Sequence, residues 1–363
     1  MQGKTTETQP AAAAHTKMRG QKEDAKEIID IDYRQTMIGI DYTRRRFFEA
    51  LSTRLNLIRV TAPLFIPSGT GLQDTLFKTE SKVKFTHPDL PGRSLETLHS
   101  LAKWKRHTLT EHHFPPYSGL FVEGHYVRGF EPYLDETHSL YVLQYDWEMT
   151  IKKEDRTLDF LKTTVKKIYE GLIQVETDVA KQFPGQIKKE LPPTITFIHS
   201  EELEKRFPGL TPREREIEIT REHKAVFIIG IGHPLPTSGK PHDERAADYD
   251  DWWTATHESY HGLNGDILVW DERLDTALEL SSMGIRVCPK SLESQSLIQG
   301  TWDETKDLHY HKHVQEELYV YSIGGGIGID RVTKWMLRKT HIGEVQVSTW
   351  PEETYKKYPT ILK

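Results

Sequence analysis

The sequence is poor in several features that mark common classes of protein. Its 363 residues include one cysteine, Cys288, which excludes an intrachain disulfide and a zinc site built from several cysteines. No apolar run approaches the roughly 18 residues of a membrane-spanning helix. Basic residues do not dominate either: 48 Lys and Arg against 54 Asp and Glu give a net charge of −6, unsuited to a protein that binds nucleic-acid phosphates. These absences favour a cytoplasmic, reducing environment with neither a membrane nor nucleic acid as partner.

The first 28 residues differ in composition from the rest of the chain. They are rich in Thr, Ala, Lys, Glu and Gln and have almost nothing apolar to bury. We therefore predict a disordered tail over residues 1–28 and one domain over residues 29–363. The tail lacks the apolar segment of a secretory signal, and its acidic residues argue against a mitochondrial presequence.

A glycine-rich stretch lies near the C-terminal end. Residues 319–323 are β-branched and aromatic, which predicts a buried strand, and glycines dominate residues 324–328. Apolar residues then recur at helical spacing. We predict a strand, a glycine turn and a helix, with Arg331 in the first helical turn pointing at the space left by the glycines. The stretch lacks the ending of a P-loop and the continuation of a dinucleotide fingerprint, and a plain tight turn stays an alternative.

A β-hairpin is predicted over residues 126–148, with Arg128 near the end of its first arm. The second arm alternates, so that Gln144, Asp146 and Glu148 share one face and apolar residues share the other. Burying three unpaired polar side chains would cost several kcal/mol, so we expect this face to line a pocket. A half-exposed strand is the alternative.

Two other segments gather charge. Ser100, Lys103, Lys105 and Arg106 surround a tryptophan and could clamp a phosphate or carboxylate, with a solvated basic face as the alternative. The loop over residues 233–253 is long enough to be functional. Its acids at 248, 250 and 251 could hold ribose hydroxyls, an ammonium group or a metal, although a solvated acidic run is the more common outcome.

The apolar strand around residues 279–286 carries Glu279 and Arg286, which need partners if they are buried. Their side chains can share one face with their polar neighbours only if the strand bulges, and we predict the bulge at Gly284. The run His309-x-His311-x-His313 invites a zinc interpretation, but alternate residues do not share a helix face, so metal binding there is disfavoured.

Several of these segments resemble one superfamily. The pattern Gly-x-Gly-x-Gly-x-x-Arg ending at Arg331 resembles motif 3 of the class II aminoacyl-tRNA synthetases, and residues 126–148 resemble motif 2. A predicted helix over 31–55 and the strand to Pro63 resemble motif 1, the dimer element of that superfamily. The blocks around Lys103 and from 279 to 286 resemble ammonia-dependent asparagine synthetase, a stand-alone relative. The resemblance implies an α+β fold, a class II synthetase-like antiparallel β-sheet flanked by helices, in a homodimer.

The resemblance also implies a reaction and a site. An aspartate–ammonia ligase makes asparagine, AMP and pyrophosphate from aspartate, ATP and ammonia through a β-aspartyl-adenylate, with Mg²⁺ bound beside the ATP. The implied catalytic residues are Arg128, Arg331, Asp74 and Lys105. Aspartate would be bound by Asp74, Ser100, Lys105, Gln144, Asp146, Ser282 and Arg286. ATP would be bound by Arg128, Asp250, Glu279, Gly326, Gly328 and Arg331, and Mg²⁺ by Glu279 and Asp266.

Ammonium is the expected nitrogen donor, because Cys288 lies in an apolar strand before a proline, a poor position for a glutaminase nucleophile. Two alternatives remain. An aspartyl- or asparaginyl-tRNA synthetase would need an anticodon-reading barrel, for which the residues before Ile31 are too few and too polar. A non-catalytic paralogue that only binds ligands would have no need of Arg128, Glu279 and Arg331 together.

Overall fold

A computed structural model describes residues 32–74, 76, 82–129, 131–257 and 260–363. The predicted tail over residues 1–28 lies outside the described residues, which belong to one compact unit. No helix in the described part of the chain has the length and apolar character needed to cross a membrane.

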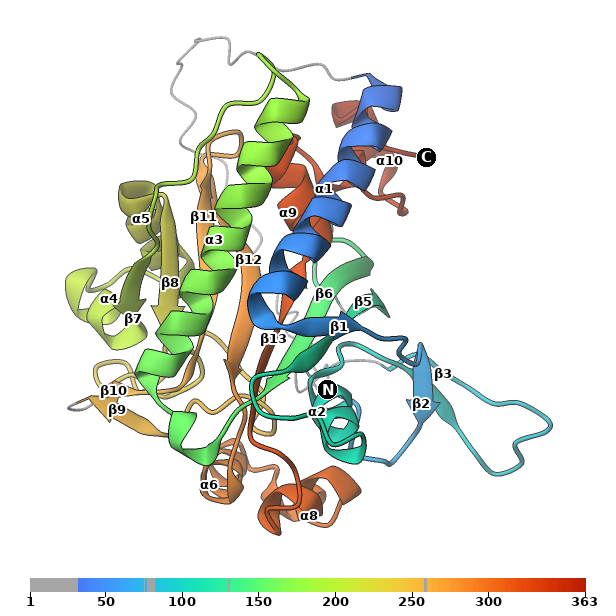
Figure 1. The fold of residues 1–363 in the computed structure, drawn as a ribbon, viewed down its shortest axis with the longest axis vertical. Helices are drawn as coiled ribbons and strands as arrows, with labels where there is room; N and C mark the ends of the chain where they lie inside the picture. The colour runs from blue at the N-terminus through green and yellow to red at the C-terminus, as the bar shows by residue number, and fades with distance from the viewer. Residues whose placement is uncertain (1–31, 75, 77–81, 130, 258–259) are drawn as a thin grey trace, which may run out of the picture. The chain divides into compact units, whose positions relative to one another are not determined.

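The unit is built on an eight-stranded sheet with the order β1-β5-β6-β13-β12-β11-β8-β7 (Figure 1). Only the outermost pairs, β1 with β5 and β7 with β8, are parallel. The five inner pairings are antiparallel, as the sequence predicts. The strands are β1 Leu57–Arg59, β5 Gly119–Val127, β6 Tyr141–Thr150, β7 Thr196–His199, β8 Ala225–Ile229, β11 Asn264–Asp271, β12 Thr276–Ile285 and β13 Ser322–Gly328.

Shorter elements surround this sheet. Two small sheets are formed by β2 Phe65–Pro67, β3 Lys84–Phe85 and β4 Leu95–Thr97, and by β9 Ala255–His257 and β10 Tyr260–His261. The α-helices of the described residues are α1 Tyr33–Leu55, α2 Ala102–Glu111, α3 Leu158–Gln182, α4 Ser200–Arg206, α5 Pro212–His223, α6 Pro289–Gln299, α7 Trp302–Thr305, α8 His309–Gln315, α9 Ile329–Met336 and α10 Glu352–Lys357. Short 3-10 turns are η1 Lys153–Asp155 and η2 Ile342–Glu344.

Helices α1 and α3 lie side by side across one face of the sheet (Figure 1). The Asp32 side chain accepts a hydrogen bond from the Gln35 amide at 2.8 Å and caps the start of α1. Gly171 lets α3 approach α1 closely, because a Cβ at this position would lie 2.7 Å from a methyl carbon of Leu51 in α1. Phe47 of α1 packs edge-on against Tyr145 of β6, with ring centroids 5.5 Å apart. One face of β6 is therefore covered, which leaves Gln144 and Asp146 on the other.

The predicted glycine turn is wrong. Residues 324–328 belong to β13 itself, and none of their glycines has a positive φ. They are needed for space instead. A Cβ on Gly324 would collide with the Glu148 carboxylate and lie 2.6 Å from Arg286 Nη2, and one on Gly325 would lie 2.5 Å from Met283 Cβ. The absence of a side chain at these glycines leaves room for side chains from the neighbouring segments to lie over β13.

The predicted bulge exists but lies elsewhere. The register between β11 and β12 shifts between Ile267 and Leu268, opposite Leu280, and not at Gly284. Gly284 pairs regularly with Gly324 of β13, where a Cβ would lie 2.9 Å from the Asp250 carboxylate. The bulge at Leu280 changes the alternation, so that Glu279, Ser282 and Arg286 reach the same side of the sheet.

Candidate active site

A cavity of about 460 Å³ opens on the face of the sheet opposite α1. It is formed by β6, β12 and β13, the start of α9 and the loop before Asp250. Twelve residues predicted from the sequence line it, namely Ser100, Arg128, Gln144, Asp146, Asp250, Asp266, Glu279, Ser282, Arg286, Gly326, Gly328 and Arg331. Asp74 and Lys105 do not line the cavity and lie directly behind its wall.

Asp74 holds the start of α2. It is fully buried, and its carboxylate accepts hydrogen bonds from the Ser100 hydroxyl and from the Ala102 amide at 2.6 Å. Burial raises the pKa of Asp74, and the charge of Lys103 offsets this only in part. Asp74 therefore orients the Ser100 side chain that does reach the cavity.

Lys105 supplies a buried positive charge behind β6. Its ammonium group donates to the Asp146 carboxylate, to the Trp147 carbonyl at 2.9 Å and to the Gly325 carbonyl at 3.4 Å. Tyr126 donates to the other oxygen of Asp146 at 2.5 Å. Asp146 is thus a fixed, charge-balanced acceptor at the cavity wall. The alternative of a solvated basic face is wrong, because Lys103, Lys105 and Arg106 are all buried.

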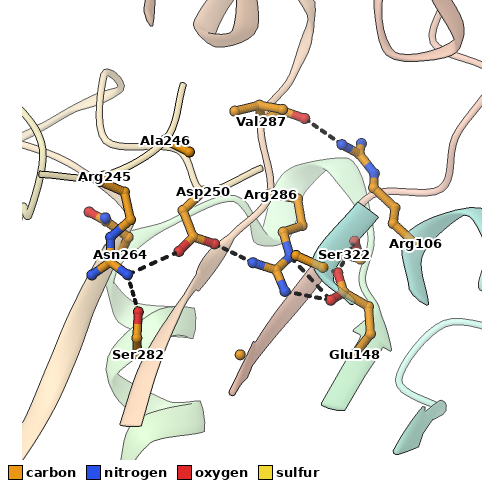
Figure 2. A network of polar contacts seen from close by, with 12 residues as sticks. Arg106, Glu148, Arg245, Ala246, Asp250, Asn264, Ser282, Arg286, Val287 and Ser322 are labelled. Atoms are coloured by element: carbon orange, nitrogen blue, oxygen red, sulfur yellow. Dashed lines mark hydrogen bonds and ion pairs between the residues drawn. The ribbon is translucent and has the colours of Figure 1, made fainter. Parts of the chain in front are cut away.

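Arg286 lies at the centre of a buried ion network (Figure 2). Its Nε and Nη2 form a fork on the Glu148 carboxylate at 2.9 and 2.6 Å, and its Nη1 pairs with Asp250. The Ser322 hydroxyl also donates to Glu148, at 2.7 Å. The fork geometry suits a guanidinium and a carboxylate, and it satisfies two charges that would be costly to bury alone.

The loop over residues 233–253 is not a solvated acidic run, which corrects that expectation. Asp250 forms a backbone bridge with Arg286 beside the end of β12, so the loop continues the sheet there. Asp251 pairs with Arg156, and Asp248 pairs with Lys103 at 2.7 Å. Burial would raise the pKa of Asp248, but Lys103 and His311 hold it below its usual value. Ion pairs from three different segments hold the loop against the cavity.

Arg245 of the same loop was not predicted from the sequence. Its guanidinium donates to Asp266 at 2.6 Å. It also donates to the Ser282 hydroxyl and lies 3.9 Å from Asp250 (Figure 2). The length of the loop and its run of ionisable residues were the only sequence signals for it. The contacts join residues far apart in the chain, so local pattern could not identify its partners.

Asp266 and Glu279 line the cavity as acids that influence each other. Burial raises the pKa of Asp266 to about 7, Arg245 opposes the rise, and the negative charge of Glu279 adds to it. A hard cation beside both carboxylates would relieve this repulsion, and oxygen donors are what Mg²⁺ prefers. The donor set therefore fits a magnesium ion.

Two arginines face the cavity from different elements. Arg128 follows β5; its Nη2 donates to the His99 carbonyl at 3.2 Å, and its Nε is buried without a hydrogen bond. No ion pair involves Arg128 among the described residues. Burial lowers its pKa, the charge of Glu131 raises it, and the charge of Arg331 lowers it further. Arg331, in the first turn of α9 as predicted, donates to the carbonyls of Thr137 and Glu279, both at 3.2 Å.

The histidines of α8 do not support a zinc site. His309 and His313 stack on one side of the helix with ring centroids 4.0 Å apart. His311 is buried on another side, 3.2 Å from Asp248. Within the described part of the chain, these three do not bring their ligand atoms together closely enough to share an ion.

Several solved structures of synthetases share this fold. The chain matches asparaginyl-tRNA synthetase from Pyrococcus horikoshii complexed with asparaginyl-adenylate, with a TM-score of 0.62 and 14% identity over 87% of this chain and 70% of that one. It matches the Entamoeba histolytica enzyme in complex with asparaginyl-adenylate at 0.61 and 14%, over 86% and 66%. The E. histolytica aspartyl-tRNA synthetase matches at 0.59 and 13%, over 88% and 58%.

These likenesses define the class of the protein by its fold, that of the class II aminoacyl-tRNA synthetase catalytic domain. The family follows from the sequence: the model of the aspartate–ammonia ligase family matches residues 34–361, and the chain belongs to that family. It is therefore a ligase that forms a carbon–nitrogen bond between aspartate and ammonia at the expense of ATP.

Proposed function

We propose that the cavity binds aspartate and MgATP together and that Arg128 and Arg331 drive adenylation. The β-carboxylate oxygen of aspartate attacks the α-phosphorus of ATP, and pyrophosphate leaves. Ammonia then attacks the acyl carbon of the β-aspartyl-adenylate, AMP leaves, and the ammonium proton passes to solvent or to a carboxylate of the wall. The observation that carries the proposal is Arg128, a partly buried cation that forms no ion pair among the described residues and has an unbonded Nε, in a cavity shared with Arg331.

The arginines hold the triphosphate. A guanidinium that has lost part of its hydration gains from binding a phosphate, and its fork matches phosphate oxygens. Negative charge builds on the bridging oxygen as pyrophosphate leaves, and Arg128 and Arg331 stabilise it without reorganising. Gly326 and Gly328 have no side chains that would occupy the space for the nucleotide. Asp250 and Glu279 are the acidic residues that we assign to the ATP-binding part of the cavity.

The aspartate subsite lies along β6 and β12. Gln144 and Asp146 present an amide and a carboxylate, Ser100 and Ser282 present hydroxyls, and Arg286 presents a guanidinium. Asp74 and Lys105 act from behind the wall, through Ser100 and Asp146. The nitrogens of Arg286 are already bonded to Glu148 and Asp250, so a substrate carboxylate competes with Asp250 for Nη1. Selectivity for aspartate then depends on charge balance within this network.

Asp266 and Glu279 would hold Mg²⁺, which supplies positive charge to the phosphate oxygens when bound. Arg245, which pairs with Asp266 in this structure, would release that carboxylate towards the ion. Chelation of the ion should abolish adenylation, and Mg²⁺ should restore it.

Ammonia is the nitrogen donor in this proposal. Cys288 stands at the N-cap of α6, where Ser291 donates to its carbonyl at 3.3 Å and lies 3.5 Å from its sulfur. No histidine is bonded to the thiol within the described residues, so it lacks the base that a glutaminase nucleophile needs. A single thiol also suits the cytoplasm, the compartment we propose.

A homodimer is the proposed assembly. Apolar side chains are exposed on and after β1, the edge strand of the sheet: Ile58 is 58% exposed, Leu64 61% and Phe65 45%. Such a patch on an edge strand suits a second copy of the same chain. Light scattering should give twice the chain mass, and Ile58→Glu should give the monomer mass.

An isotope experiment tests the chemistry. Aspartate labelled with ¹⁸O in its β-carboxylate is incubated with MgATP and ammonium, and AMP and pyrophosphate are analysed by mass spectrometry. One labelled oxygen should appear in AMP and none in pyrophosphate, with asparagine formed in equal amount. The absence of label from AMP would contradict the proposal. A rate with glutamine equal to that with ammonium would also contradict it. Charging of transfer RNA with aspartate would instead favour a synthetase.

A further inference from the structure

Three potential metal ligands from three segments meet away from the cavity described above. Within the residues that the structure describes, one set of three such groups has all its ligand atoms within 4.8 Å of one another: Glu201, His233 and His261. Glu201 stands in the first turn of α4, His233 follows β8, and His261 ends β10. None of the three lines the active-site cavity.

The backbone at this point is built to bring the three segments together. Gly230 has a φ of 81° and Gly262 a φ of 107°. A Cβ on Gly262 would lie 2.7 Å from Gly230 Cα, and one on Gly230 would lie 2.6 Å from the His261 carbonyl oxygen. Any larger residue at either position would separate the segment after β8 from the segment after β10.

His199 fixes two of the three candidate ligand residues through their backbones. Its Nδ1 accepts from the Glu201 amide at 3.2 Å, and its Nε2 donates to the His261 carbonyl at 2.8 Å. Its ring also stacks on Tyr260 with centroids 4.3 Å apart. Both ring nitrogens of His199 are therefore engaged, and the ring is held between α4 and β10.

Two of the three candidate ligand residues have buried ligand groups. The Nδ1 of His261 is buried and has no hydrogen-bond partner. Glu201 is only 2% exposed, and its carboxylate lies within 4.8 Å of a ring nitrogen of both imidazoles. A buried carboxylate beside an unsatisfied imidazole nitrogen is a suitable environment for a cation.

We propose that Glu201, His233 and His261 form a binding site for one divalent transition-metal ion of the Zn²⁺ type, separate from the magnesium site of the reaction. Two imidazoles and one carboxylate are a common set of protein ligands for zinc, with water completing the coordination. Magnesium is a poor occupant because it prefers oxygen donors.

Binding would change the local geometry in a defined way. The His233 and His261 rings are stacked with centroids 4.0 Å apart and planes 3° from parallel. A metal ion lies in the plane of each imidazole that binds it, so one ring has to turn out of the stack. The ion would then join α4, the exit of β8 and the β9–β10 hairpin at the root of the loop that carries Arg245 and Asp250. It would stabilise that loop without touching the substrates.

The test uses the full-length protein, without any histidine tag, and Zn²⁺ or Co²⁺ alone as probe. Equilibrium dialysis is done with Mg²⁺ in large excess, so that the oxygen-rich active-site acids are occupied. We expect one Zn²⁺ per chain, a visible absorption band on Co²⁺ binding, and a higher midpoint of thermal unfolding with Zn²⁺. His261→Phe keeps an aromatic stack on His233 but removes the ligand, and it should abolish all three signals. Glu201→Gln should weaken binding without changing the shape of the side chain.

Three controls make the result decisive. His313→Phe removes one of the two neighbouring histidines on α8, and Asp266→Asn removes an active-site acid; both should keep full Zn²⁺ binding. His199→Gln should lower the affinity about 10- to 100-fold, as expected for a residue that orients metal ligands. Circular dichroism of each variant separates loss of the site from loss of the fold. The proposal is overturned if no saturable binding occurs in excess Mg²⁺. It is equally overturned if binding survives in His261→Phe, or is lost in His313→Phe or Asp266→Asn.

Discussion

Arg128 and Arg331 lie far apart in the sequence but face the same cavity, and the positive charge of Arg331 lowers the pKa of Arg128. One guanidinium follows β5 and the other begins α9. Antiparallel pairing of β5 with β6 and of β6 with β13 is what brings them together. Glu131 offsets the repulsion at Arg128 in part, and Glu279 lies 3.5 Å from Arg331; a bound triphosphate would remove the repulsion that remains.

Neutralising either arginine should therefore lower the activity without lowering the thermal stability. Arg128→Met should lower aspartate-dependent ATP–pyrophosphate exchange by about 100- to 1,000-fold, the usual cost of losing one donor to a developing charge. The substrate-free variant should unfold at a temperature no lower than wild type, because repulsion by Arg331 is gone. Arg206→Met, which removes an exposed arginine paired with Glu222, should change neither property. Retention of more than a tenth of the exchange rate would contradict the assigned role.

The glycines of β13 predict a graded series of alanine variants. Gly324→Ala should destabilise most, because its Cβ would collide with Glu148 and press on Arg286. Gly326→Ala places a Cβ 2.8 Å from Gln144 Oε1, so we expect a higher KM for aspartate with a folded protein. Gly328→Ala meets only Arg331 carbons at 3.6 Å or more, an ordinary contact, and should keep the stability of wild type. Thermal unfolding and steady-state kinetics on the three proteins check the order; equal losses in all three would contradict it.

Local periodicity predicted the polar face of β6 correctly. Alternation over residues 143–148 has a period of two, so the side of the sheet on which Gln144 and Asp146 lie follows from the sequence alone. The same reasoning failed at β13. Glycine permits a turn and also permits close approach within a strand, and only the presence of Glu148 and Met283 on neighbouring strands decides between them.

The errors at the site have a common cause. The bulge opposite Leu280 depends on the register with β11, and the burial of Asp250 depends on Arg286, which lies far along the chain. Arg245 was missed because its partners, Asp266 and Ser282, lie on two strands that follow it in sequence. The resemblance to a family identified only residues that lie within the matched motifs, and Arg245 lies outside all of these motifs.

Arg286 should contribute strongly to folding as well as to binding. It is 2% exposed and bonded to two buried carboxylates. Arg286→Met leaves Glu148 and Asp250 with only more distant cations, Lys105 at 3.8 Å and Arg245 at 3.9 Å. We expect the free energy of unfolding, measured with urea, to fall by about 3–5 kcal/mol. Arg286→Lys should lose less, because charge remains but the fork does not. Adding Glu148→Gln to Arg286→Met should recover part of the loss, since one unpaired charge disappears; further destabilisation by that second change would contradict the argument.

Asp330 predicts a pH dependence of stability. Its carboxylate, at the start of α9, accepts from Arg44 at 2.8 Å and from Gln346 at 2.5 Å. Burial raises its pKa to about 6, while Arg44 and Gln346 oppose the rise. The folded protein thus binds this proton more tightly than the unfolded chain, whose aspartate titrates near 3.8. The contribution is complete below about pH 4 and is lost as the pH rises through 6, by up to about 3 kcal/mol.

Asp330→Asn keeps an acceptor for Arg44 and removes the titration, which makes it the direct comparison. The difference in unfolding free energy, wild type minus Asp330→Asn, should be most favourable to wild type near pH 4 and should fall steadily to pH 7. Asp41→Asn, an exposed residue of α1 paired with Arg45, should show no such trend. If the Asp330 difference is constant or grows with pH, Arg44 outweighs burial and the carboxylate is ionised throughout. In that case α9, and with it Arg331, would be held in place by a permanent ion pair rather than by a protonated acid.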